Sequence, residues 1–416
     1  MGQTILEKII QAHSTHEVRP GAIVWLELDV RSARDFGGPN VVKHYQREYG
    51  DLPPDPQRTF FTFDLCAPAC SLKYADNQQL CRDFARRHGL TVFDVDRGVG
   101  SHVLMEEGLA VANSTVAGTD SHMNILGAVG SFGQGMGDVD IAFAFRTGRT
   151  WFEVPPTVKV KVKGRPHPSA AAKDLTLFIL RELGTKALAN MAVEFSGPAV
   201  GELTLAGRIT LCSMVTEMAG IIGFVPEHGP ALEEEVRAFT GRPFKPWEAD
   251  LDADYTSLIE LDASGLEPQI AEPPSPTQVK NVAALRGRPV DSGFLGSCTN
   301  GRTEDFAAAA RLLKGRRVKP GFMLKAVPAT RRVYEDLLRQ GILQTLFEAG
   351  AIVINPGCGG CAEGHAGLTG KGEIQISTGN RNFPGKQGQG STYLASPEVV
   401  AASSLLGIIA GPEDVR

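Results

Sequence analysis

The sequence lacks any long apolar run. None of its segments approaches the ~20 consecutive apolar residues that a helix needs to cross a bilayer, and residues 1–8 lack the basic-then-apolar order of a secretory signal. Long blocks of one charge are also missing. The net charge of -5, from 42 basic and 47 acidic residues, argues against a general role on nucleic acids or membrane surfaces. We therefore expect a cytoplasmic protein that binds neither.

Cysteine is scarce, and its distribution is informative. The 416 residues include seven cysteines, an odd number. In a long chain without an export signal, a framework of disulfides is not expected, and metal or redox chemistry is the better interpretation of any clustered subset. The seven are Cys66, Cys70, Cys81, Cys212, Cys298, Cys358 and Cys361.

Length and pattern together indicate an α/β protein with more than one domain. The chain is longer than one ordinary hydrophobic core requires. Apolar spacing predicts a helix over residues 4–12, a buried strand over 22–28 and another strand over 155–162. A helix that ends at Gly184 is expected after this last strand. Strands that alternate with helices favour α/β architecture.

A proline-rich break divides the chain. Residues 267–290 contain clustered prolines and polar residues, which predict a linker or a surface crossover. We expect two parts, residues 1–285 with the candidate acid–base groups and residues 286–416 with the clustered cysteines.

The clustered cysteines lie in two glycine-rich loops. Cys298 follows a predicted strand, and Cys358 and Cys361 form a C-x-x-C pair after another. Three thiolates from two loops can hold an iron–sulfur cluster, and glycines let the backbone approach it closely. Spacing alone leaves a zinc site or a thioredoxin-like redox pair open. His365, close after Cys361, is a candidate fourth ligand for zinc.

Longer motifs surround these cysteines, and further motifs lie elsewhere in the chain. They are GSCTNGR at 296–302, PGCGGC at 356–361, STGNRNFPG at 377–385, GTDSH at 118–122, WFEVP at 151–155 and YLASP at 393–397. Through them the chain resembles the aconitase superfamily, and within it the large subunits of isopropylmalate isomerases and homoaconitases. The resemblance implies a three-subdomain α/β/α architecture with mixed sheets around a [4Fe-4S] site, without the swivelling domain of single-chain members.

The resemblance also implies the cofactor. In this family a [4Fe-4S] cluster is held by three cysteines, which match Cys298, Cys358 and Cys361. The fourth iron stays open, binds the hydroxyl and a carboxylate of the substrate, and acts as a Lewis acid in the loss and return of water.

Acid–base groups carry over by position. His102, Asp120, His122 and Glu217 match family active-site residues, and Asp64 matches the aspartate of another family segment. In the family the aspartate pairs with the first histidine and the glutamate with the second, and such pairing raises the pKa of an imidazole. Arg381, Lys386, Asn300 and Asn380 match residues beside the substrate and the cluster.

Several positions depart from the family pattern. Leu65 stands where relatives place a histidine thought to protonate the leaving hydroxyl, and leucine cannot transfer a proton. Ser213 replaces a usual asparagine, Lys386 a usual arginine, and Gly37-Gly38 a turn that usually contains threonine. These changes predict a divergent member that retains the cluster cysteines and differs on the substrate side. Cys66, within the altered segment, is interpreted as a buried apolar residue or as a thiol that lines the site.

The missing swivelling domain implies a partner. We expect a separate small subunit to supply the catalytic base, and a hydroxy di- or tricarboxylate of the 3-isopropylmalate type as substrate. Two other functions stay open on the sequence: a non-enzymatic iron or redox sensor that binds RNA without its cluster, and a degenerate scaffold subunit.

Overall fold

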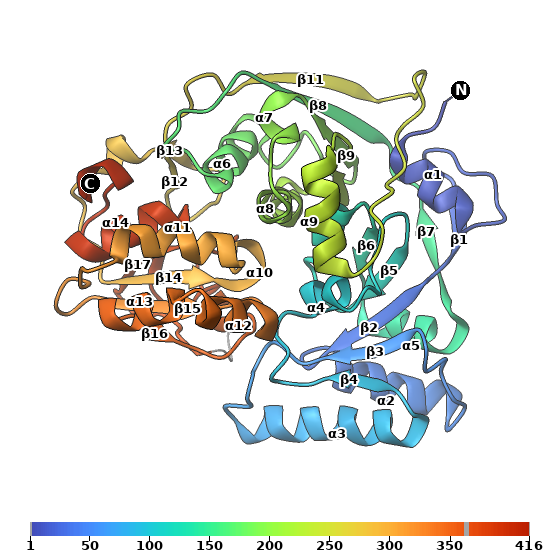
Figure 1. Ribbon diagram of the computed structural model, residues 1–416. Helices are drawn as coiled ribbons and strands as arrows, with labels where there is room; N and C mark the ends of the chain where they lie inside the picture. Colours follow the sequence, from blue (N-terminus) through green and yellow to red (C-terminus); the bar gives the residue numbers. More distant parts are fainter. Residues whose placement is uncertain (1, 362–365, 416) are drawn as a thin grey trace.

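The computed structural model describes residues 2–361 and 366–415, which form three main sheets and a two-stranded ribbon (Figure 1). His365 lies outside the described residues. In the described part of the chain, no helix has the length and apolarity to cross a membrane.

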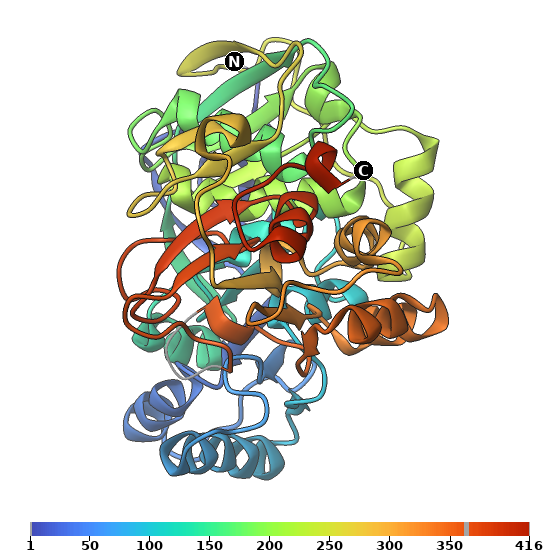
Figure 2. The same cartoon turned by 90° about the vertical axis from the view of Figure 1, so that its left-hand side faces the viewer.

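The first sheet is entirely parallel and lies at one end of the molecule, against α2, α3 and α5 (Figure 1 and Figure 2). In spatial order its strands are β4 (Thr91–Phe93), β3 (Thr59–Thr62), β2 (Val30–Arg34), β5 (Thr115–Gly118) and β6 (Phe132–Gly135). The helices are α2 (Gly38–Tyr49), α3 (Leu72–His88) and α5 (Asp138–Thr147), with α4 (Gly100–Glu106) and η1 (Met123–Val129) on the side of the second sheet.

The second sheet is also parallel. Its order is β10 (Ile222–Phe224), β9 (Ala192–Ser196), β8 (Thr157–Lys163) and β11 (Ser257–Asp262). Its helical elements are α6 (Ala172–Leu183), α7 (Pro198–Gly201), α8 (Leu205–Ser213), η2 (Met214–Met218) and α9 (Pro230–Thr240).

The third sheet is mixed and is formed by the C-terminal part of the chain. Its order is β13 (Val279–Asn281), β12 (Gln269–Ala271), β18 (Ser391–Ala395), β17 (Ile374–Ser377), β14 (Ser292–Gly296), β15 (Met323–Val327) and β16 (Ile352–Val353). The helical elements are η3 (Val282–Leu285), α10 (Ser297–Asn300), α11 (Thr303–Leu313), α12 (Arg331–Arg339), α13 (Ile342–Ala349), η4 (Gly359–Cys361), α14 (Pro397–Leu406) and η5 (Pro412–Val415).

Two local predictions are confirmed. Helix α1 (Ile5–Ala12) begins at a capping box, in which the Thr4 side chain accepts from the Glu7 N–H and the Glu7 carboxylate accepts from the Thr4 N–H. Helix α6 ends at Gly184, which has a positive φ that suits glycine.

Two other predictions are correct only in part. The strand expected over residues 22–28 is present as β1 (Ile23–Glu27), but it is not fully buried, because it pairs only with β7 (Arg149–Glu153) in a ribbon and its side chains alternate between solvent and core. Residues 267–290 were expected to form a linker or a surface crossover, and the linker is wrong, because β12 pairs with β18 within the third sheet. The clustered prolines Pro273, Pro274 and Pro276 lie between β12 and β13 and leave these two strands free to pair. The division of the chain into two parts at residue 285 stays a prediction. Two strands of the third sheet, β12 and β13, lie before that residue.

Candidate functional site

Three polar side chains meet at the carboxyl edge of the first sheet. Arg34 ends β2, Asp64 follows β3 and Asp120 follows β5, and β2 lies between the other two strands. Parallel neighbours end at the same edge, where ligands bind in open α/β sheets. The strand order therefore places the arginine between the two aspartates.

The three predicted cysteine ligands meet at the same kind of edge in the third sheet. Cys298 lies on α10 directly after β14, while Cys358 and Cys361 lie in the loop after β16. Cys358 and Cys361 are hydrogen-bonded to each other, and Ser297 bonds to Cys361. Burial raises the pKa of Cys298 to about 12, and the charge of Cys361 adds to this rise.

Glycines bring these loops together. Gly296, before Ser297, has φ +136°, and a Cβ there would lie 2.0 Å from the Val327 carbonyl oxygen. Gly357, before Cys358, has φ +151°, and a Cβ there would lie 2.8 Å from the Asp64 carbonyl oxygen. That same oxygen accepts from the Cys358 N–H at 2.9 Å. Only glycine suits both positions, so the loop of Cys358 lies directly against the end of β3.

The donor set fits an iron–sulfur cluster. A cluster distributes its thiolates over several iron atoms, whereas zinc needs four donors around one ion. In the described ranges, no group of three or more histidine, cysteine or acidic side chains, these three cysteines included, already stands in a metal-holding arrangement. The hydrogen bond with Cys358, together with the charges of Lys386 and Arg34, lowers the pKa of Cys361 to about 6, which favours the thiolate that iron binds. Near the cysteines, buried polar atoms such as Nδ1 of His102 and Oδ1 of Asn300 have no partner among the described residues.

Arg34 joins the two sheet edges. Its guanidinium donates to Oδ1 of Asp64 at 2.8 Å, to Oδ1 of Asp120 at 3.0 Å and to Sγ of Cys358 at 2.8 Å. The arginine side chain is only 11% exposed. One buried cation thus contacts two predicted catalytic carboxylates and one predicted cluster ligand.

The two carboxylates differ in protonation. Burial raises the pKa of Asp64 to about 7, with the nearby charges of Asp35 and Asp120 adding and Arg34 opposing. Burial also acts to raise the pKa of Asp120, but the charges of Arg34 and His122 outweigh it and hold this pKa below its usual range. Adjacent acids with separated pKa values are a common property of catalytic sites.

The expected pairing of Asp120 with His102 is wrong. His102 Nε2 donates instead to the Cys298 carbonyl oxygen at 2.8 Å, and no hydrogen bond joins it to Asp120 in the part of the chain described. Oδ1 of Asp120 already accepts from Arg34 and from the His122 N–H. The pKa of His102 is lowered to about 3, not raised, by burial and by the charge of Arg302. His102 is therefore a neutral imidazole that fixes the loop of Cys298.

The expected pairing of His122 with Glu217 is present. His122 Nε2 lies 3.1 Å from Oε1 of Glu217 and 2.8 Å from Nδ2 of Asn380. Arg381 donates through Nε to the same Glu217 oxygen at 2.8 Å. Asn380 also lies 3.8 Å from Sγ of Cys298, so this group adjoins the cysteines. Depending on its tautomer, Nε2 donates to Glu217 or accepts from Asn380.

The remaining predicted residues occupy different places. Asn300 is buried and donates to Thr210 and Asp305, so it supports α10. Lys386 is half-buried, and its charge acts on Cys361. Leu65 is buried in the apolar cluster that also contains Cys298 and Cys358, and its side chain cannot donate a proton. Ser213 bonds to the Thr299 hydroxyl at 2.8 Å, beside Cys298.

Sequence reasoning missed three residues: Arg34, Asp35 and Lys173. Lys173, on α6, is fully buried and donates from Nζ to the carbonyl oxygens of Thr378 at 3.1 Å and Gly379 at 2.7 Å. These carbonyls directly precede Asn380 and Arg381. Burial lowers the pKa of Lys173 to about 7. The one sequence signal near Lys173 was the neighbouring Asp174. Its carboxylate accepts from the Ala171 N–H and so marks the beginning of α6.

Replacing Lys173 with methionine is expected to reduce activity by roughly tenfold or more. The change leaves two buried carbonyls unpaired, which costs roughly 1–3 kcal/mol, and loosens the backbone that carries Arg381. KM for a carboxylate substrate should rise more than kcat falls. Lys163→Met, on the exposed face of β8, is the control. Equal kinetics for both variants would contradict a positioning role for Lys173.

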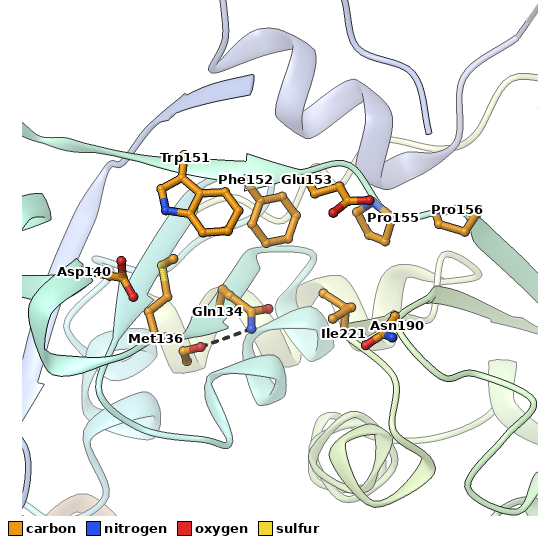
Figure 3. Close-up of a pocket in the computed structure, with 11 residues that line it drawn as sticks. Gln134, Met136, Asp140, Trp151, Phe152, Glu153, Pro155, Pro156, Asn190 and Ile221 are labelled. Atoms are coloured by element: carbon orange, nitrogen blue, oxygen red, sulfur yellow. Dashed lines mark hydrogen bonds between the residues drawn. The ribbon is translucent and has the colours of Figure 1, made fainter. Parts of the chain in front are cut away.

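A separate cavity lies away from these residues. It has a volume of about 560 Å³ and is lined by Gln134, Met136, Trp151, Phe152 and Ile221, among others (Figure 3). None of the predicted site residues lines it. The chemistry of the site is therefore assigned from the convergence of side chains and not from this cavity.

Comparison with known proteins identifies the family of the chain. A model of the aconitase family (aconitate hydratase) matches residues 7–289 and 278–407. The chain belongs to the aconitase family, as its motifs predicted.

Two relatives are similar over their whole length. A probable 3-isopropylmalate dehydratase large subunit from Methanothermobacter thermautotrophicus is 40% identical over 420 residues, covering 100% of both chains. The homoaconitase large subunit of Thermus thermophilus is 41% identical over 421 residues, covering 100% of this chain and 99% of that one. Aconitase X of Thermococcus kodakaraensis has a TM-score of 0.51 over 90% of this chain and 89% of its own, at 12% identity, which supports the fold alone.

Proposed function

We propose that this chain is the large subunit of a hydro-lyase that removes and returns water on a hydroxy di- or tricarboxylate of the 3-isopropylmalate or homoaconitate type. One observation carries the proposal: Arg34 contacts Asp64, Asp120 and Cys358 at once. The candidate acid–base carboxylates and one candidate cluster ligand thus lie within hydrogen-bond distance of the same guanidinium. The names of the full-length relatives support the same reaction class.

In this proposal Cys298, Cys358 and Cys361 hold a [4Fe-4S] cluster. When bound, the cluster supplies a Lewis-acidic iron for the hydroxyl and a carboxylate of the substrate. Arg381 and Lys386 bind carboxylates, Arg381 through a planar fork that matches carboxylate geometry.

The acid–base work falls to the protein. His122 holds or releases a proton at Nε2, and Glu217 and Asn380 orient its ring. Asp64, with a pKa near neutrality, is the candidate to replace the proton donor lost at Leu65. A small partner subunit would complete the site.

The test is anaerobic reconstitution of the chain with iron and sulfide, followed by assays with and without a small-subunit partner. We expect dehydration of 3-isopropylmalate or homocitrate only in the complex. Added hydroxy-acid should also shift the spectroscopic signal of the cluster in the large chain alone. Strong turnover by the chain alone would contradict the need for a partner, and no response to any hydroxy-acid would contradict the reaction class.

Replacing Glu217 with glutamine is expected to lower kcat by about 10²–10⁴-fold, the usual contribution of acid–base catalysis. The amide removes the negative charge shared by His122 and Arg381 but keeps the shape of the side chain. Glu182→Gln, at a surface ion pair on α6, is the matched control and should be silent. An unchanged kcat in the Glu217 variant would remove the His122–Glu217 pair from the mechanism.

A further inference from the structure

Two cysteines outside the proposed cluster site lie in contact. Cys66 and Cys70 belong to the loop between β3 and α3, and their sulfur atoms are 2.8 Å apart. The Cys70 N–H also donates to Sγ of Cys66 at 3.0 Å. Cys66 is buried, whereas Cys70 is exposed. A disulfide requires an S–S distance of about 2.05 Å, so the sulfurs need to move by less than one ångström.

The buried member of the pair is held in place. Asp35 accepts from the Cys66 N–H at 3.1 Å, and Gln78 donates to the Cys66 carbonyl oxygen at 2.8 Å. Gln78 also donates to Asp35 at 3.0 Å, which closes a small buried network. The exposed member lies at the other end of the loop, just before the N-cap Ser71. This geometry keeps the Cys66 sulfur fixed below the surface and places Cys70 at the surface.

We propose that Cys66 and Cys70 form a redox-active dithiol, a modification site for peroxides. The exposed Cys70 thiolate attacks one oxygen of hydrogen peroxide, the O–O bond breaks, and the leaving hydroxide takes the thiol proton as water. Cys66 then attacks the sulfur of the Cys70 sulfenic acid, the S–O bond breaks, and a second water leaves with the Cys66 proton. Two thiols are oxidised to one disulfide, and the peroxide is reduced to two waters.

The order of events follows from the surroundings. Burial raises the pKa of Cys66 to about 11, so its thiol is a poor first nucleophile, while Cys70 is accessible. The same loop contacts the loop that carries Cys358 and Cys361, because Asn355 donates to the Ala67 carbonyl oxygen at 3.4 Å. The inference does not depend on the hydro-lyase activity.

Peptide mass spectrometry of the full-length, reconstituted chain tests the proposal. The protein is treated with limited hydrogen peroxide, denatured, alkylated and cleaved with trypsin; residues 59–73 then form one peptide with both cysteines and no other. We expect this peptide to lose two hydrogens and its alkylated form to fall ~10-fold, with recovery after dithiothreitol. Cys81, in the next peptide, is the internal control.

Two variants make the result decisive. In Cys70→Ser, Cys66 should remain open to alkylation after peroxide, because its partner is gone. In Cys81→Ser, the disulfide should form as in the parent chain. The proposal is overturned if Cys66 is still blocked in Cys70→Ser, if the parent peptide stays fully alkylated, or if Cys70 is found only as sulfinic acid or joined to another peptide.

Discussion

Replacing Cys298 with alanine is expected to abolish both cluster assembly and turnover. Cys298 is the only one of the three predicted ligands that the third sheet presents from β14, since the other two share the loop after β16. The two remaining thiolates, both on one loop, cannot replace a set of three cluster ligands. Because enzymes accelerate reactions by ~10⁶-fold or more, loss of the Lewis acid should lower activity by at least ~10³-fold. Iron content and visible absorbance after anaerobic reconstitution measure the loss.

The control is Cys81→Ala, a buried cysteine on α3 in the N-terminal part of the chain. It should lose some stability, as large-to-small core changes do, but retain full iron. Metal analysis also separates the two site chemistries that the sequence left open, since a zinc site would bind zinc and little iron. A Cys298 variant with a full iron complement would show that another residue holds the metal.

Local sequence predicted much of this site. The C-x-x-C pair and the motif around Cys298 each follow a strand, and parallel strands put their carboxyl ends at one edge, so convergence of the three thiols was expected. The pairing of His122 with Glu217 was implied by the family resemblance and not by local sequence. For the cysteines, each motif carries its own context: a strand, a glycine-rich turn and the functional residue.

The position of Arg34 could not be predicted from local sequence. It depends on the strand order β3-β2-β5, which places three distant segments side by side. The same order explains why the expected bond from Asp120 to His102 was wrong, since the carboxylate is already engaged by the arginine. The linker over residues 267–290 was misjudged for a similar reason, because β12 is stabilised by a partner more than a hundred residues later, β18.

Replacing Arg34 with methionine is expected to be the most destabilising single change at the site. It would leave Asp64 and Asp120 buried beside each other without a cation, and breaking a buried ion pair costs about 3–5 kcal/mol. Both carboxylates would then take up protons in the folded state. Displacement of Asp64 and Asp120 should also lower kcat/KM by ~10²-fold.

The pH dependence identifies the cause. The pKa of Asp120 is lower in the folded parent chain than in the unfolded chain. Its carboxylate therefore stabilises the fold at pH values above the unfolded pKa, and this stabilisation is lost as the pH falls through the folded pKa. Without Arg34 the stabilisation by the Asp120 carboxylate disappears, and ionisation of Asp64 and Asp120 in the folded state costs free energy. The gap in unfolding free energy between the parent and the variant should therefore be largest at neutral and alkaline pH. It should narrow as pH falls towards about 4, the ordinary range of carboxyl pKa values.

Urea unfolding of the chain from pH 5 to 8 measures this gap. Arg82→Met is the matched control, because Arg82 pairs with Asp94 in a half-exposed bridge on α3, and such a change should cost no more than about 1 kcal/mol. Arg34→Lys keeps the charge but has no planar fork. A single ammonium cannot reach Asp64, Asp120 and Cys358 together, so this variant should recover stability more than activity. A gap independent of pH, or equal to that of Arg82→Met, would mean that Arg34 acts through packing and not through its charge.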